Sequence, residues 1–146
     1  MIIRKMTEGD RAHVKEMMRV FYSSPAVHTS GSEEIFDADV SECVGDSPYL
    51  EGYVFDEDEK IMGYSMIAKS FSTEFGKPCA WVEDIYILEE ARGRGYATEF
   101  FKFVDEKYKG CVIRLEADAD NESALRVYRR AGFSEMPYLE LKKEAK

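Results

Sequence analysis

Two stretches in the first third of the chain carry apolar residues at helical spacing. One stripe consists of Val14, Met17, Met18 and Phe21, and the other of Phe36, Val40, Cys43 and Val44. Such spacing places each set on one face of a helix. Thr7 and Asp10 resemble a capping box before the first helix, and Pro25 ends it. Ser32 caps the second helix and Gly45 ends it. We therefore expect two amphipathic helices after an opening strand at MIIRK.

The remaining segments alternate between strand and helix patterns. The stretches YLEGYVFD and KIMGYSMIAKSF flank the acidic turn EDE, which predicts an antiparallel hairpin. CAWVEDIYIL and CVIRLEAD indicate two further strands, and the apolar stripe of the helix between them is Ala97, Phe101, Val104 and Tyr108. This order predicts a right-handed crossover that joins parallel strands. A last helix is capped by Asp120 and ends at Gly132, and YLELKK is expected to close the sheet.

These elements predict one mixed domain. The order of strands and helices is typical of the α/β or α+β class. A chain of 146 residues suits a single domain over residues 1–146. Domains of this length bury about 70% of their unfolded surface, so they need no disulfide to support the core. The three cysteines lack metal-ligand spacing, so we expect free thiols and no metal site.

The charge and hydropathy of the chain narrow the classes of partner. A net charge of −9 with a pI near 4.8 disfavours nucleic acid and is compatible with cationic partners such as amines. The N-terminus carries no apolar leader, and no run approaches the ~20 apolar residues of a membrane span. We expect a cytoplasmic protein that binds neither nucleic acid nor membrane.

The stretch ARGRGYATEF lies between a predicted strand and the start of a predicted helix. Backbone N–H groups at a helix N-terminus lack partners, and the helix dipole favours anions there. Glycines let the backbone approach a ligand, and arginines add positive charge. The stretch therefore predicts a phosphate site. A Walker loop would require Gly-Lys-Ser/Thr, and the dinucleotide fingerprint would require a third glycine or alanine where Thr98 stands.

A different family fits both this stretch and a second one. RGRGYA matches the Arg/Gln-x-x-Gly-x-Gly/Ala signature of the GNAT superfamily of N-acetyltransferases, and NESALRVYRRAGF matches its downstream Asn-x-x-Ala-x-x-x-Tyr-x-x-x-Gly-Phe pattern. The chain thus resembles this family over residues 92–133 by motif and over its whole length by element order. The resemblance implies a mixed sheet of about six to seven strands with a splayed parallel pair, about four helices, and acetyl-CoA as co-substrate.

The resemblance also implies roles for individual residues. The backbone of the signature would hold the coenzyme A pyrophosphate, through Arg92, Gly93, Arg94, Gly95, Tyr96 and Ala97. The backbones of Ile85 and Ile87 would pair with the pantetheine arm, Asn121 would bond the same arm, and Tyr128 would protonate the leaving thiolate. Direct attack by an amine requires a base as well, because alkyl amines with a pKa near ~10.4 arrive protonated.

Two carboxylates compete for the role of base. Glu83, with Asp84 beside it on the predicted strand, resembles the acidic pair that lines the amine site in polyamine acetyltransferases. Glu116 resembles the glutamate base of N-terminal acetyltransferases that act on ribosomal proteins. We favour Glu83, since we expect its side chain to share a face with Ile85 and Ile87, and Asp84 is expected to bind substrate. Adjacent side chains of a regular strand point to opposite faces, so only one of the two reaches the amine unless a bulge turns both inward.

The acceptor and the assembly stay open at this stage. A small amine, a polyamine or a protein amine would each fit an N-acetyltransferase. An acyl-CoA-binding regulatory module is the rival class, although it would not need both Tyr128 and Glu83. An acetylase of aminoacyl-tRNA is disfavoured by the net charge of −9. A homodimer is compatible with the sequence.

Overall fold

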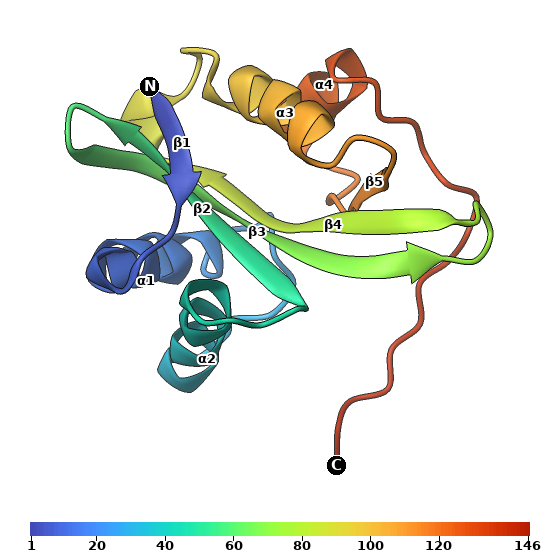
Figure 1. The fold of residues 1–146 in the computed structure, drawn as a ribbon, viewed down its shortest axis with the longest axis horizontal. Coiled ribbons are helices and arrows are strands. Elements are labelled where there is room, and N and C mark those ends of the chain that lie inside the picture. The colour runs from blue at the N-terminus through green and yellow to red at the C-terminus, as the bar shows by residue number, and fades with distance from the viewer.

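The computed structural model describes residues 1–146 and is built around one twisted sheet (Figure 1). The sheet has five strands in the order β1-β2-β3-β4-β5. Their bounds are β1 Ile2–Lys5, β2 Leu50–Glu57, β3 Lys60–Ser72, β4 Lys77–Ile87 and β5 Val112–Leu115. Neighbours pair antiparallel except β4 and β5, which are parallel. The crossover predicted from the sequence therefore joins β4 to β5.

Two pairs of helices cover the two faces of the sheet. Figure 1 shows α1 (Arg11–Phe21) and α2 (Glu33–Val44) on one face, and α3 (Tyr96–Lys107) and α4 (Glu122–Arg130) on the other. Each face has its own apolar core. The core between the sheet and the pair α1 and α2 contains Val14, Met18, Phe36, Val40 and Tyr64. The core between the sheet and α3 contains Phe55, Ile67, Phe100, Phe101 and Val104. The helical stripes seen in the sequence form these cores. None of the helices combines the length and apolar character needed to span a bilayer.

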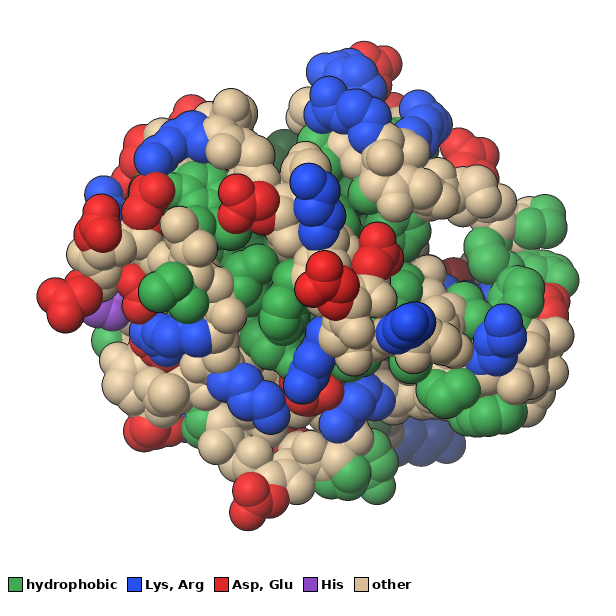
Figure 2. Space-filling view, turned by 45° about the horizontal axis from the view of Figure 1, so that its top comes forward, with side chains coloured by type: hydrophobic (Ala, Val, Ile, Leu, Met, Phe, Trp, Pro, Cys, Tyr) green, Lys and Arg blue, Asp and Glu red, His purple; other side chains and the backbone are tan.

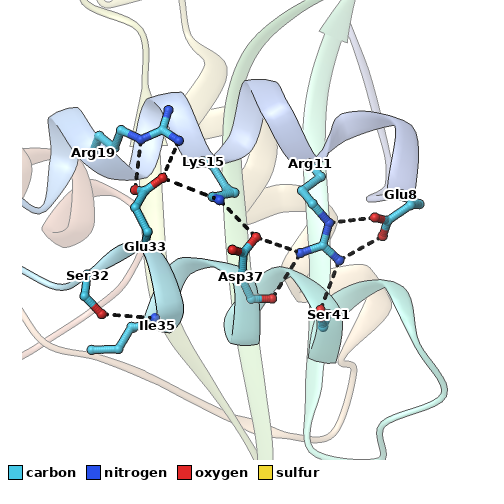
Figure 3. Close-up of polar contacts among 9 residues, drawn as sticks. All are labelled: Glu8, Arg11, Lys15, Arg19, Ser32, Glu33, Ile35, Asp37 and Ser41. Carbon is cyan, nitrogen blue, oxygen red and sulfur yellow. Dashed lines mark hydrogen bonds and ion pairs between the residues drawn. The ribbon is translucent and has the colours of Figure 1, made fainter.

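A ladder of ion pairs fixes α1 against α2 on the solvent side (Figure 3). Arg19 contacts Glu33 at 2.6 Å, Lys15 contacts Asp37 at 3.0 Å, and Arg11 contacts Asp37 at 3.3 Å. The cations recur every four residues along α1, and Glu33 and Asp37 recur at the same spacing along α2. Each set therefore lies on one face of its helix, and the two faces form ion pairs with each other. Exposed pairs of this kind stabilise a fold by about 0–1 kcal/mol each. Their main effect is to set the relative position of the two helices.

Close packing at Gly52 brings α2 against β2. A Cβ atom at this position would lie 2.6 Å from the Cβ of Cys43 and 2.9 Å from the Cε of Met6. No side chain fits there, so glycine allows α2 to lie directly on the strand. This contact places the inner side of α2 directly over β2.

The sequence-based expectations for the C-terminal part need two corrections. The sheet has five strands rather than six to seven, because YLELKK forms no strand. Met136 contacts Arg114, and Tyr138 donates a 2.6 Å hydrogen bond to Glu74 in the β3–β4 turn. These contacts route the tail past the end of the hairpin (Figure 1), where it finds no strand partner. Leu139 and Leu141 are consequently 92% and 94% exposed.

The second correction concerns the start of α4. Its cap is Asn121, whose side-chain oxygen accepts a hydrogen bond from the Ala124 N–H at 3.3 Å. Asp120, the expected cap, lies one residue too early and instead donates its N–H to Asp118 at 2.8 Å. Ser32 is confirmed as the cap of α2, since its hydroxyl accepts from the Ile35 N–H at 3.2 Å (Figure 3).

Candidate active site

The loop between β4 and α3 presents a row of free backbone donors. Gly93 and Gly95 have φ angles of 77° and 85°, a region that favours glycine. A Cβ atom at either position would meet nothing within 4 Å, so the space above both glycines is open. The N–H groups of residues 93–98 donate no hydrogen bond within the protein. Free donors at the start of a 12-residue helix have the geometry and polarity that suit a phosphate-bearing ligand.

The arginine side chains of this loop shape it rather than line it. The Arg92 Nε donates a 3.0 Å hydrogen bond to the carbonyl oxygen of Ile87. Arg94 donates to the carboxylate of Glu57 at 2.8 Å, and the hydroxyl of Tyr96 donates to the same oxygen at 2.5 Å. The loop is thus tied to the end of β2. The sequence interpretation had the arginines adding charge for the anion, but the charge of Arg94 is partly balanced by Glu57.

The parallel strands β4 and β5 separate beside this loop. Their pairing runs from Cys79 with Val112 to Val82 with Leu115, where β5 ends. β4 continues to Ile87, so the segment that contains Ile85 and Ile87 has no neighbour on its β5 side. The splayed pair implied by the family resemblance is therefore present. The gap leaves backbone groups of β4 open to an extended ligand.

A β-bulge interrupts β4 next to the gap. Met66 of β3 pairs with Asp84, and the next residue of β3, Ile67, pairs with Val82. Glu83 therefore has no partner and is the extra residue of the bulge. A bulge of this kind turns neighbouring side chains to one face of the sheet.

The bulge changes which face the side chains of β4 cover. Ala80 and Val82 belong to the core under α3, and so do Ile85 and Ile87 after the bulge. Glu83 and Asp84 both line a cavity on the α1–α2 side. Our expectation that Glu83 shares a face with Ile85 and Ile87 is thus wrong. The physical reason is the extra residue, which brings two adjacent carboxylates to the same face.

This cavity has a volume of about 340 Å³ and collects carboxylates from two elements. Asp39 and Glu42 enter it from α2, opposite the acidic pair of β4. The full lining is Tyr22, Asp39, Glu42, Tyr49, Leu50, Met66, Ala68, Glu83 and Asp84. It contains no lysine, arginine or histidine, so the cavity carries excess negative charge.

Asp84 is the most deeply placed of these carboxylates. It is 5% exposed, and its carboxylate accepts hydrogen bonds from the hydroxyls of Tyr22 at 2.9 Å and Tyr64 at 2.7 Å. Its backbone oxygen accepts a third bond from the Ser65 hydroxyl at 2.7 Å. Burial raises the pKa of Asp84, while the two tyrosine hydrogen bonds oppose this shift. Two neutral donors hold the group in place without neutralising it.

Burial, with added crowding of negative charge, raises the pKa values of the neighbouring carboxylates as well. Glu83 is exposed by its overall surface area, yet burial of its carboxyl group raises its pKa, with help from Asp84 and Glu140. Burial, followed by the charges of Asp84 and Glu83, raises the pKa of Asp39 to about 6. A carboxylate with a raised pKa accepts a proton more readily, as a general base requires.

Glu116 and Asn121 lie after the end of β5. A hydrogen bond with Glu140 of the tail, together with burial, raises the pKa of Glu116 to about 7. Because Asn121 uses its amide oxygen to cap α4, its NH₂ group remains for a ligand. Neither residue lines the acidic cavity. Glu116 thus lies outside the cavity but near it, because the charge of Glu83 also raises its pKa.

Tyr128 on α4 is packed between aromatic rings with its hydroxyl free. Its ring lies edge-on to Phe101 and Phe133, with centroids 5.7 Å and 6.2 Å away. The hydroxyl makes no hydrogen bond within the protein, and burial raises the pKa of the phenol. The group is therefore protonated at neutral pH and able to donate.

Sequence reasoning missed the contribution of the helices to the cavity. Asp39 lies three residues after Phe36 and four before Cys43, so it shares their side of α2. That spacing was a usable signal, although DADVSE has the composition of a solvated face. Tyr22 and Glu57 carried no signal, because their partners are distant in sequence.

Positive side chains are spread over the surface of the molecule, and one group of them lies on α4. Figure 2 shows lysines and arginines gathered at its top over α4, the helix that carries Arg126, Arg129 and Arg130. This helix lies on the opposite face of the sheet from α1 and α2 (Figure 1). The acidic cavity and the most basic helix are thus on different sides of the sheet.

Comparison with known proteins places the chain in a family. The profile of the acetyltransferase (GNAT) family matches residues 14–133. A Bos taurus protein named thialysine N-epsilon-acetyltransferase is 28% identical over 148 residues, which covers 92% of this chain and 85% of that protein. The Mus musculus protein of the same name is 26% identical over 147 residues, covering 92% and 84%.

A solved structure shows that the fold is shared. AAC(6')-Iy in complex with the bisubstrate analogue CoA-S-monomethyl-acetylneamine superposes with a TM-score of 0.79 at 18% identity, covering 99% of this chain and 98% of its own. The free donors at α3 and the gap between β4 and β5 suit coenzyme A, as the motifs implied. The chain belongs to the GNAT family and is an acetyl-CoA-dependent N-acetyltransferase.

Proposed function

We propose that the protein transfers the acetyl group of acetyl-CoA to the primary amine of a small molecule, such as an alkyl amine or polyamine. The observation that carries this proposal is the acidic cavity beside the splayed end of β4, with Glu83 and Asp84 on its wall. A cavity of about 340 Å³ accommodates a small acceptor. The names of the mammalian relatives and of the aminoglycoside N-acetyltransferase support an amine acceptor.

The free donors of the loop would hold the co-substrate. The N–H groups of residues 93–98 offer hydrogen bonds to the pyrophosphate, with Arg94 and Tyr96 keeping the loop in shape through Glu57. The open side of β4 at Ile85 and Ile87 would pair with the pantetheine arm, and the free NH₂ of Asn121 would bond it as well. Acetyl-CoA supplies an activated thioester, whose carbon–sulfur bond is replaced by a carbon–nitrogen bond.

Glu83 would act as the general base. An alkyl ammonium that enters the cavity must lose a proton before its nitrogen can attack a carbonyl carbon. The raised pKa of Glu83 brings this carboxylate closer to the range in which a base works well at neutral pH. Asp84, fixed by Tyr22 and Tyr64, would keep a negative charge beside the ammonium and orient it.

Tyr128 would act as the general acid. Its hydroxyl is free, and its raised pKa keeps the proton on the phenol until a thiolate forms. The proton then passes to the leaving sulfur. Both substrates bound together allow direct transfer, so no nucleophilic cysteine or serine is needed.

One observation favours a second candidate. Glu116 has a pKa near neutrality, about 7, which suits the glutamate base of an N-terminal acetyltransferase. However, its raised pKa depends first on Glu140 of the exposed tail, and it does not line the cavity. We therefore assign Glu116 second place as the base.

Thiol release from acetyl-CoA in the presence of a panel of acceptors tests the proposal. The panel should contain alkyl monoamines, diamines, polyamines and peptides with a free N-terminus. Faster thiol release with small amines than with peptides supports the proposed function. Faster release with peptides, or release that no acceptor stimulates, would overturn it.

A further inference from the structure

The far wall of the cavity makes the acceptor site two-sided. Asp39 and Glu42 lie on α2, whereas the proposed base and its neighbour lie on β4. All four carboxylates line the same cavity, and the charges of Asp84 and Glu83 act on Asp39 across it. Between them the lining is apolar, formed by Leu50, Met66 and Ala68. This arrangement suits an alkyl chain with a positive charge at each end.

No cation of the protein neutralises these carboxylates. The three cations of α1, namely Arg11, Lys15 and Arg19, are all engaged with Glu8, Glu33 and Asp37 on the solvent side (Figure 3). None of the ion pairs of the molecule includes Asp39, Glu42, Glu83 or Asp84. Asp84 is nine-tenths buried and still has only neutral donors. Asp39 is half-buried, whereas Glu42 and Glu83 are exposed. Buried and half-buried carboxylates such as Asp84 and Asp39 are costly without a counter-ion unless a ligand supplies the positive charge.

We infer that Asp39 and Glu42 are specificity residues that bind a second ammonium group of the acceptor and reject acceptors that carry a carboxylate. The inference rests on the proposed function and names the acceptor class more narrowly, as diamines or longer polyamines rather than amino acids. A carboxylate of the acceptor would lie among four acidic side chains with no lysine, arginine or histidine in the lining. Such like-charge contacts discriminate against the wrong ligand as effectively as attractive ones favour the right one.

Three acceptors that differ by one group each provide the test. Pentylamine has one amine, 1,5-diaminopentane adds the second ammonium, and L-lysine adds a carboxylate to that diamine. We expect kcat/KM for 1,5-diaminopentane, corrected for its two equivalent amines, to exceed that for pentylamine by about tenfold, the value of one charge-assisted hydrogen bond. L-lysine should fall below 1,5-diaminopentane by a similar factor or more.

Substitution of the far wall then identifies the residues responsible. In the double variant Asp39→Asn with Glu42→Gln, the ratio of kcat/KM for 1,5-diaminopentane to that for pentylamine should fall toward one, and the penalty on L-lysine should shrink. Glu34→Gln is the matched control, since Glu34 is an exposed carboxylate of α2 outside the cavity. The melting temperature and the KM for acetyl-CoA of each variant report on folding and on the co-substrate site.

The possible results distinguish a failure of this inference from a failure of the proposed function. L-lysine as good as 1,5-diaminopentane, or a double variant with an unchanged ratio, would overturn the role of Asp39 and Glu42 while leaving amine acetylation intact. Absence of acetylation with all three acceptors, although acetyl-CoA still raises the melting temperature, would instead overturn the proposed function and this inference with it.

Discussion

The hydroxyl of Tyr96 donates a 2.5 Å hydrogen bond to the carboxylate of Glu57, and the two residues are 39 positions apart in the chain. Arg94 donates to the same carboxylate oxygen at 2.8 Å. The end of β2 therefore anchors Tyr96, the first residue of α3, which follows the loop of residues 92–95 (the anion loop). The loop has few other contacts, because Gly93 and Gly95 face open space. Besides the hydrogen bond from Arg92 to the carbonyl oxygen of Ile87, the carboxylate of Glu57 is the main contact that fixes its shape.

Glu57→Ala should therefore weaken acetyl-CoA binding and leave the chemistry intact. We expect the KM for acetyl-CoA to rise about two- to fivefold, the range that exposed ion pairs contribute, with little change in kcat. Glu59→Gln is the control, since Glu59 lies in the turn after β2, is exposed and forms no ion pair. Steady-state kinetics at saturating amine measure the effect. A fall in kcat at constant KM would show that the anchor serves another purpose.

Gly95→Asp should abolish the rise in melting temperature that acetyl-CoA causes by binding the folded state. The substitution puts a carboxylate beside the free N–H groups that we propose bind the pyrophosphate. It also strains the backbone, which has a φ angle of 85° at this position. Gly110→Asp matches the strain, because Gly110 has φ of 86° and equally open surroundings after α3. We expect Gly110→Asp to retain the acetyl-CoA shift. Loss of the shift in both variants would assign the effect to strain alone.

Glu83→Gln should lower kcat/KM for a diamine and remove the rise of the pH–rate profile. A general base works when deprotonated, so kcat/KM increases as the pH rises through its pKa, which burial raises in Glu83. Glu116→Gln should have the smaller effect. If Glu116 is the base, the rise should centre near its pKa of about 7 and disappear in Glu116→Gln. That outcome would favour the N-terminal acetyltransferase alternative.

Tyr128→Phe should lower kcat by about 10² or more, because the leaving sulfur loses its proton donor. The phenyl ring keeps its contacts with Phe101 and Phe133, so the KM for acetyl-CoA and the melting temperature should change little. Tyr138→Phe removes a hydroxyl from the exposed tail and serves as control. Turnover that survives in Tyr128→Phe would make this tyrosine a packing residue.

Asp39→Asn should stabilise the protein at pH 7.5 and not at pH 4. The pKa of Asp39 in the folded protein is raised to about 6, so ionisation of this carboxyl group costs folding free energy. The cost is absent at low pH, where the group is protonated, and is fully present once the pH has risen through 6. Asparagine stays neutral and avoids it. We expect a gain of about 1 kcal/mol, or ~3 °C in Tm, after allowance for solvent screening.

Asp37→Asn, two residues away on α2, should behave in the opposite way. The hydrogen bond from Lys15 lowers the pKa of Asp37, and burial raises it by less, so the pKa of Asp37 lies below its usual value. Its stabilising charge is therefore present at pH 7.5 and lost as the pH falls. Thermal unfolding of both variants at the two pH values tests this contrast. The same sign for both at pH 7.5 would contradict the charge assignment of the cavity.

Much of the fold follows from local patterns in the chain. The helical stripes, the cap at Ser32 and the hairpin around Asp58 are local signals, and the structure confirms each of them. The strand expected at YLELKK does not form, because alternation of apolar and polar residues is compatible with a strand but does not provide a neighbouring strand to pair with. Hydrogen bonds from a neighbouring strand decide whether such a segment joins a sheet, and the contacts of Tyr138 hold the tail away from one.

The site was harder to predict because it depends on register between distant segments. Val82 and Ile85 cover the same face although they are three residues apart, an odd spacing that requires a bulge. In a strand that is apolar on both faces, this change of phase was invisible. The motif residues of the anion loop were predictable because their chemistry is local. The cavity required three strands, α2 and the end of α1 to be placed together.

The ladder between α1 and α2 has a kinetic consequence. The cations of α1 are paired with Glu33 and Asp37 on the solvent side, so they do not neutralise the carboxylates of the cavity. The negative electrostatic potential of the cavity therefore extends into the solvent. Fields of this kind draw oppositely charged molecules toward a cleft and raise their association rate. Salt shortens their range, to about 10 Å at 0.1 M. Capture of a dicationic acceptor should therefore slow as ionic strength rises, whereas capture of a neutral molecule should not.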